Sequence, residues 1–163
     1  MTATPRTTLK KFSLAQKDEP MAELVRDTDK KILAVWAIDC TEHVLPYFEE
    51  KYPEDPRPRD ALAVLREWIT TGEFHMAVIR SASLASHAAA REAGEDNAAR
   101  SAARSAGQAV ATAHVPTHSL GAAIYAQQAV WRAADPARAD AAVKEERDWQ
   151  ERHLLELKGL SGP

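Results

Sequence analysis

Apolar residues recur at intervals of three and four along most of this chain, which is the spacing of one face of an α-helix. The first long run extends from about residue 27 to residue 51. Its apolar face carries Ile32, Leu33, Trp36, Cys40 and Val44. Pro46 lies inside the run and cannot donate a backbone hydrogen bond to the carbonyl four residues earlier. The pattern therefore predicts two helical segments at an angle, with the break near residues 42–46.

Further apolar stripes continue the helical pattern to the end of the chain. They predict helices over residues 58–71, 74–94, 97–113, 117–131 and 135–158, after a short N-terminal helix that begins near Ser13 and is stopped by Pro20. The last helix is highly charged and is expected to lie on the surface. Because no run of alternating β-branched residues indicates a strand, we expect an all-α bundle of six or seven helices.

The stretch from Ser105 to Trp131 contains no Asp, Glu, Lys or Arg, although 28% of the chain is charged. It does not predict a membrane span, because a bilayer requires about 20 predominantly apolar residues in succession. Polar residues and a proline interrupt it at Gln108, His114, Pro116, His118, Gln127 and Gln128. We interpret it as a central pair of Ala-rich, uncharged helices whose axes approach closely.

Length and composition narrow the possible functions. The 163 residues suit one domain, and the single cysteine, Cys40, excludes an internal disulfide. We expect a flexible N-terminus over residues 1–12, a helical domain over 13–158 and a flexible tail over 159–163. The lack of a signal-like apolar block favours a cytoplasmic protein without membrane contact. A net charge of −3 argues against nucleic-acid binding, and nothing in the composition indicates the oligomeric state.

Negative charge is concentrated where the first long run ends. Between Asp39 and Asp55 there are six acidic residues and one basic residue, Lys51. A solvated helix end is the ordinary explanation for such a strip, but an acidic surface also attracts a basic partner. The candidate partner-binding residues are Glu49, Glu50, Glu54, Asp55, Arg57 and Arg59.

Several residues capable of metal binding or acid–base chemistry occur at helical spacing. Asp39 and His43 are four residues apart, which suits an ion pair, an oriented general base or one edge of a metal site. A third ligand would have to come from His87, His114 or His118. A structural hydrogen bond is the commonest role for such residues, and we expect no cofactor.

A short row of positive charge lies beside the uncharged stretch. Arg100 and Arg104 form a short row that could hold a phosphate. Pairing with nearby carboxylates is the favoured interpretation, and the candidates are Glu92, Glu95 and Asp96. The chain has no Gly-rich phosphate loop and no Gly-x-Ser-x-Gly nucleophile motif.

Three segments, in this order, resemble a known bacterial family. They are WAIDCTEHVLP at residues 36–46, PRDAL at 58–62 leading to Trp68 and Gly72, and AGQAVATAHVPTH at 106–118. Over about residues 30–134 the chain is similar to the putative immunity proteins that are likened to the fifth immunity family of polymorphic toxin systems. The resemblance implies a small, all-helical cytoplasmic protein without enzymatic activity that binds and neutralises a cognate toxin.

Two other classes of function stay open from the residues. The first is a metal- or ligand-dependent enzyme with a site inside the bundle, since helical bundles place such sites on facing helices. Its residues would be Asp39, His43, His87, His114 and His118. The second is a small helical subunit or scaffold of a larger assembly.

Overall fold

The computed structural model describes residues 12–14 and 17–160, and this part of the chain contains helices and no strand. The all-α prediction is therefore confirmed. The helices are α1 (Glu19–Arg26), α2 (Lys30–Val44), α3 (Pro46–Glu49), α4 (Arg57–Thr71), α5 (Met76–Glu92), α6 (Ala98–Ala111), α7 (His118–Ala133) and α8 (Ala139–Leu160), with a 3₁₀ turn at Pro136–Arg138. The described residues thus form eight α-helices instead of the expected six or seven.

Proline explains the difference in number, because it begins helices here and does not only end them. Pro20 lies in the first turn of α1, where the Asp18 carboxylate accepts a hydrogen bond from the Met21 amide at 3.2 Å. The helix expected before Pro20 is wrong at Ser13 and Leu14, which are not helical, and its residues 15–16 lie outside the described part. Pro46 separates α2 from α3, as predicted.

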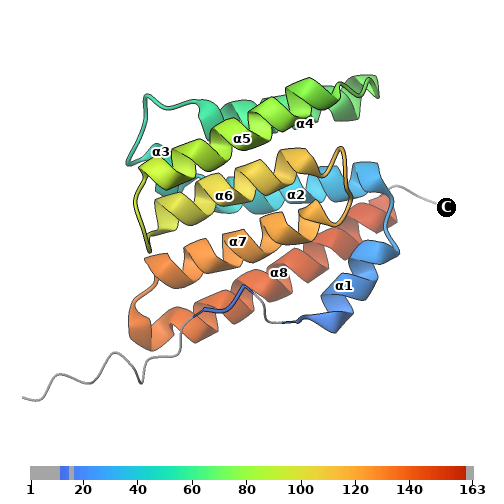
Figure 1. Ribbon diagram of the computed structural model, residues 1–163. Coiled ribbons are helices and arrows are strands. Elements are labelled where there is room, and N and C mark those ends of the chain that lie inside the picture. Colours follow the sequence, from blue (N-terminus) through green and yellow to red (C-terminus); the bar gives the residue numbers. More distant parts are fainter. Residues whose placement is uncertain (1–11, 15–16, 161–163) are drawn as a thin grey trace, which may run out of the picture.

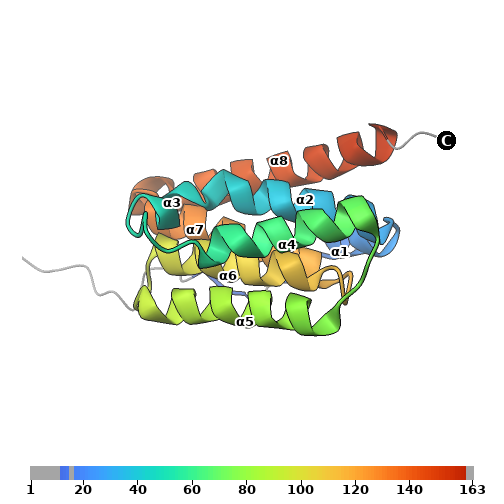
Figure 2. The same cartoon turned by 90° about the horizontal axis from the view of Figure 1, so that it is seen from above.

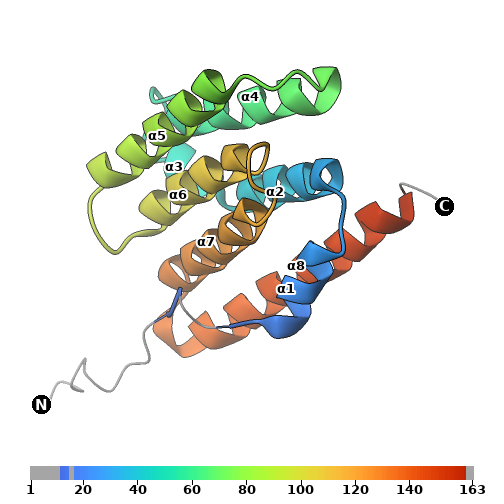
Figure 3. The same ribbon diagram turned by 45° about the vertical axis from the view of Figure 1, so that its right-hand side comes forward.

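The helices lie in layers that are visible from two directions. In Figure 1, α4 and α5 form one edge of the bundle, α2 and α6 lie in the middle, and α7 and α8 lie towards the opposite edge. Figures 2 and 3 show the last turns of α8 extending past the neighbouring helices. Helix α6 contacts α2, α3, α4, α5 and α7, and nine of its 14 residues are buried.

The interior of the bundle is built largely from alanine. Ala106, Val110 and Ala123 are fully buried, whereas Ile124 is half-buried. Small side chains let backbones approach, and serine hydroxyls then reach carbonyls on the next helix. The Ser86 hydroxyl donates to the Ala103 carbonyl at 2.7 Å, and the Ser105 hydroxyl donates to the Ala122 carbonyl at 2.8 Å.

Two glycines accommodate side chains from neighbouring residues. A Cβ atom at Gly107 would lie 2.6 Å from Nε2 of His87, and one at Gly121 would lie 2.7 Å from Oε1 of Gln108. Both distances are shorter than a carbon atom tolerates. The positions of these two polar side chains therefore depend on glycine.

Helix α8 lies at the surface, as its charge predicts, but one of its faces is buried. Leu154 and Gln150 are fully buried. The Gln150 carbonyl accepts from Nε1 of Trp36 at 2.9 Å, and its side-chain amide donates to the Ala123 carbonyl at 3.0 Å. One face of α8 is thus part of the core and joins α2 to α7. Among the described residues, no helix is long and apolar enough to span a membrane.

Candidate functional site

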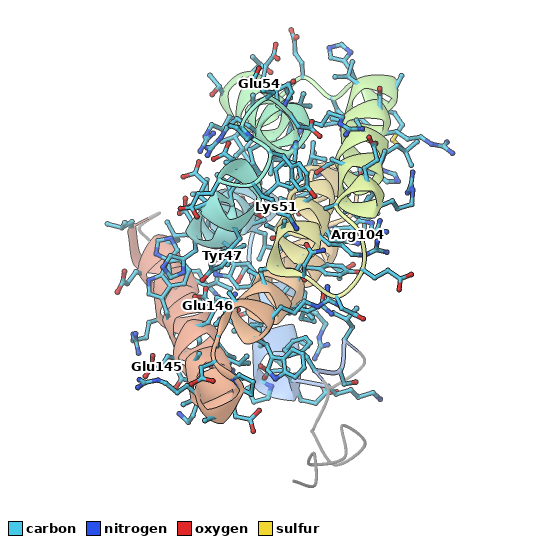
Figure 4. All side chains as sticks on the ribbon, turned by 90° about the vertical axis from the view of Figure 1, so that its left-hand side faces the viewer. Tyr47, Lys51, Glu54, Arg104, Glu145 and Glu146 are labelled. Atoms are coloured by element: carbon cyan, nitrogen blue, oxygen red, sulfur yellow. The ribbon has the colours of Figure 1, made fainter. Side chains whose placement is uncertain are left out.

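The six candidate partner-binding residues lie at one end of the bundle, on α3, the loop after it and the start of α4. We call this surface the charged edge: Glu49, Glu50, Glu54, Asp55, Arg57 and Arg59. Figure 4 looks onto this end, where Glu54, Lys51 and Tyr47 project from α3 and the loop, and Glu145 projects from α8.

Two arginines fix the shape of the charged edge. Arg57 binds Asp55 through Nε and Nη2 at 2.9 and 2.7 Å, and its Nη1 donates to Glu92 of α5 at 2.7 Å. Arg59 binds both oxygens of Glu49, at 3.1 and 2.7 Å. The hydrogen bonds from Arg57 lower the pKa of Asp55, so this carboxyl stays ionised at neutral pH.

The remaining two carboxylates of the charged edge are free. Glu50 and Glu54 are exposed and form no ion pair with any other described residue. Tyr47, on the same end of the molecule, is also exposed, with 38% of its surface accessible. The edge therefore combines a loop braced by ion pairs with two unpaired carboxylates and an exposed aromatic side chain, and Lys51 beside them is also exposed. Charged and aromatic groups of this kind are typical of protein recognition surfaces.

Asp39 and His43 do not pair with each other but with residues of α8. Asp39 accepts from Nε2 of His153 at 2.6 Å, and Nδ1 of His43 lies 2.8 Å from Glu146. The Trp149 ring stacks between the two imidazoles, with centroid distances of 4.2 and 5.0 Å. These contacts give Asp39 and His43 a structural role in holding α8 against α2.

The other three candidate histidines converge on a different place. His87 of α5, His118 of α7 and His114 before it line a cavity of about 260 Å³, together with Ile79, Leu84, Gly107 and Ala111. We call this cavity the histidine pocket. Its walls are mostly hydrocarbon, and its polar side chains are the three imidazoles, Gln108, Ser83 and Arg80.

Two of the pocket's three histidines, His87 and His118, are held uncharged by their surroundings. Burial, together with the positive charge of Arg104, lowers the pKa of His87 to about 4. Burial also lowers the pKa of His118, and the nearby His114 adds to the effect. At neutral pH both rings are therefore neutral imidazoles.

The arrangement does not assemble a metal centre from these candidates. Among the residues that the structure describes, no three His, Cys, Asp or Glu side chains could hold a metal ion. Cys40 is fully buried, and burial raises the pKa of its thiol. A protonated, enclosed thiol is a poor nucleophile.

The pairing expected for Arg100 and Arg104 is wrong. Arg100 donates to the Gly94 carbonyl, and Arg104 donates to Nδ1 of His87 at 2.9 Å. Two of the three candidate carboxylates pair with other arginines: Glu92 binds Arg57 and Asp96 binds Arg132. The local sequence did not indicate these pairs, because each carboxylate binds an arginine more than 30 residues away along the chain.

The sequence interpretation missed His153, Glu146 and Arg80. His153 and Glu146 face α2 across more than 100 residues. Their spacing with Trp149 on one side of α8 was the available signal. Arg80 lines the histidine pocket, and nothing in its local sequence distinguishes it from other exposed arginines.

Comparison with known proteins identifies one family. A model of the family described as Imm-5 like putative immunity protein matches residues 23–157, which is most of the chain. No curated protein and no solved structure matches.

Proposed function

We propose, from the premise that this chain belongs to the Imm-5 like putative immunity protein family, that it binds and neutralises a cognate protein toxin. The family is one of immunity proteins and not of enzymes. A binding role suits a molecule whose candidate acid–base groups are spread over two separate places. Asp39 and His43 serve the contact between α2 and α8, and the other three histidines line the pocket.

The observation that carries this proposal is the charged edge. Free carboxylates at Glu50 and Glu54 attract a basic surface, and the ion pairs of Arg57 and Arg59 hold the loop that presents them. A preorganised loop loses less conformational entropy on binding. Tyr47 supplies the kind of aromatic group that concentrates binding energy.

The rest of the molecule would act as the scaffold for this surface. We propose that residues 13–158 fold as one domain with α6 and α7 as its central pair, which carries no charged residue between Ser105 and Trp131. The high burial of the alanines on both helices supports this role. The protein would act in the bacterial cytoplasm as the immunity component of a polymorphic toxin system.

Charge reversal at the free carboxylates tests the charged edge. In the double variant Glu50→Lys and Glu54→Lys, we expect the association rate with the toxin encoded beside this gene to fall about tenfold at low salt. The difference should shrink at high salt, because ions screen charges that are exposed to solvent. Stopped-flow measurements of the original protein and the double variant at two ionic strengths give the association rates to compare.

A matched control carries the same change in net charge at another place. Glu23 of α1 and Glu67 in the second half of α4 are also exposed and form no ion pair with a described residue. Reversing these two to Lys should leave the association rate within about twofold of the original. Equal rate losses in both double variants would show that only net charge matters and would contradict a contact at the charged edge.

A further inference from the structure

The histidine pocket takes no part in the interaction proposed for the charged edge. It lies between α5, the end of α6 and the start of α7, and α5 lines it from Met76 to His87. Arg57 of the charged edge binds Glu92, the last residue of α5, which does not line the pocket. The two surfaces therefore meet this helix at different positions.

His87 presents a hydrogen-bond donor to the pocket. Nδ1 of His87 lies 2.9 Å from a guanidinium nitrogen of Arg104. Because a guanidinium only donates, Nδ1 must accept, and the proton of the neutral ring lies on Nε2. No buried side-chain nitrogen of the described residues lacks a partner. Nε2 of His87 has no hydrogen bond within the described structure, so it is accessible from the pocket.

His118 presents an acceptor by the same reasoning. Its Nδ1 lies 2.8 Å from Oε1 of Gln108, an oxygen that can only accept. Nδ1 therefore carries the proton, and Nε2 has a free lone pair. The Gln108 side chain keeps this position because residue 121 is a glycine. The pocket thus offers one donor and one acceptor on neutral rings.

The surroundings disfavour a cation and favour an aromatic group. No carboxylate lines the pocket, and Arg80 does. The lowered pKa values of His87 and His118 keep both rings uncharged at neutral pH. The ring of His114, which lines the pocket, stacks on the exposed Phe74 ring at a centroid distance of 6.0 Å. Aromatic and aliphatic walls of this kind bind planar apolar rings.

We infer that the histidine pocket binds a tyrosine side chain of the protein partner, whose phenol ring lies against the apolar walls while its hydroxyl accepts from His87 and donates to His118. The inference rests on the proposed function, because it takes the partner to be the toxin. A phenol hydroxyl is uncharged at neutral pH and both donates and accepts. The volume of about 260 Å³ is near the lower end for ligand pockets and suits one side chain.

Small fragments test the pocket without the toxin. We would titrate the full chain with N-acetyltyrosinamide and with N-acetylphenylalaninamide, following the imidazole NMR signals of His87 and His118. The tyrosine fragment should bind with a Kd on the order of 1 mM. The phenylalanine fragment should bind at least about fivefold more weakly, because it leaves both imidazoles unpaired. Absence of binding, or equal binding of the two fragments, would overturn the inference.

Substitutions in the pocket locate the binding. Ala111→Leu fills the cavity, and Leu84→Ser removes an apolar wall at a position that is already 57% exposed and tolerates the change. Each should weaken binding of the tyrosine fragment about tenfold. Ala63→Leu, on an exposed position of α4, is the control and should bind like the original protein. Unchanged binding in a folded Leu84→Ser protein would place the fragment elsewhere and contradict the inference.

Binding of the toxin by the same variants separates failure of this inference from failure of the proposed function. Leu84→Ser should weaken the toxin complex, and Ala63→Leu should not. If the toxin binds Leu84→Ser as tightly as the original protein, the pocket is not part of the interface and the inference fails. If the original protein binds tyrosine fragments in the pocket but binds no toxin, the proposed function fails, and with it the identification of the partner.

Discussion

The ring of His87 occupies the space that a side chain at residue 107 would fill. Glycine at that position lets the imidazole lie against α6, where Arg104 donates to its Nδ1 at 2.9 Å. The same placement removes the ring from water, and burial is the largest cause of its lowered pKa. One missing methyl group thus sets the position, the tautomer and the charge of a neighbouring histidine.

The lowered pKa of His87 predicts a loss of stability in acid. The folded ring takes up a proton near pH 4, and the unfolded ring does so near pH 6.5. The stabilisation is therefore complete above pH 6.5 and is lost progressively as the pH falls to about 4. Between pH 7.5 and 4.5, the free energy of unfolding should fall by about 2 kcal/mol more in the original protein than in His87→Asn.

Urea unfolding at the two pH values measures this difference. Asparagine is a suitable replacement because its side-chain oxygen can accept from Arg104 and does not titrate. Carboxylates elsewhere titrate in both proteins, so their contribution cancels in the comparison. Equal falls in the free energy of unfolding of the two proteins would show that the His87 ring takes up its proton as readily in the folded chain as in the unfolded chain, and would contradict the prediction.

At the level of helices, α8 is charged on its exposed face and packs into the core with the opposite face. Its acidic and basic residues predict exposure, yet Gln150 and Leu154 are fully buried against α2 and α7. The His43, Trp149 and His153 rings form a stack along the same contact. Helix α8 therefore contributes to the stability of the bundle through a narrow face.

Two adjacent leucines test this description of α8. Leu154 is 0% exposed and Leu155 is 52% exposed. Leu154→Ala should lower the free energy of unfolding by about 2–5 kcal/mol, because it removes buried methyl groups and leaves a cavity. Leu155→Ala should change it by less than about 0.5 kcal/mol. Chemical denaturation of both variants measures the difference, and similar losses would contradict the burial of this face.

Two predicted helix ends, at residue 71 of α4 and at residue 97 before α6, match the structure because local signals fix them. Gly72 ends α4 in the left-handed conformation, and the Asn97 side chain accepts from the Arg100 amide at the start of α6. Both depend on neighbouring residues only. The contact between Asp39 and His153 joins residues 114 positions apart, and no local pattern encodes it. No local pattern encodes the convergence of the three pocket histidines either, because they come from α5, α7 and the segment between α6 and α7.

At the scale of the whole molecule, the unpaired carboxylates of the charged edge and two arginines without an ion pair lie at different places. Glu50 and Glu54 follow α3, whereas Arg80 lines the histidine pocket and Arg104 binds His87 beside it. Neither arginine forms an ion pair with a carboxylate among the described residues. The two surfaces that we propose as contacts therefore differ in their chemistry.

The thermal stability of the whole molecule should also be independent of metal ions. The described residues bring no three potential ligands together, and the proton on Nε2 of His87 blocks the nitrogen that faces the pocket. Treatment with EDTA should therefore leave the Tm unchanged within about 1 °C. Elemental analysis of the purified protein should find no stoichiometric zinc, iron or manganese. A bound metal together with a lower Tm after chelation would restore the possibility of a metal-dependent site.

The course of the histidine pocket along α5 sets how much of a partner reaches both surfaces. The pocket is lined by α5 from Met76 to His87, and the charged edge is braced on the same helix at Glu92. At 1.5 Å per residue, the rise to Glu92 is about 7.5 Å from His87 and about 24 Å from Met76. A fully extended partner segment covers the first distance with about two or three residues and the second with about seven.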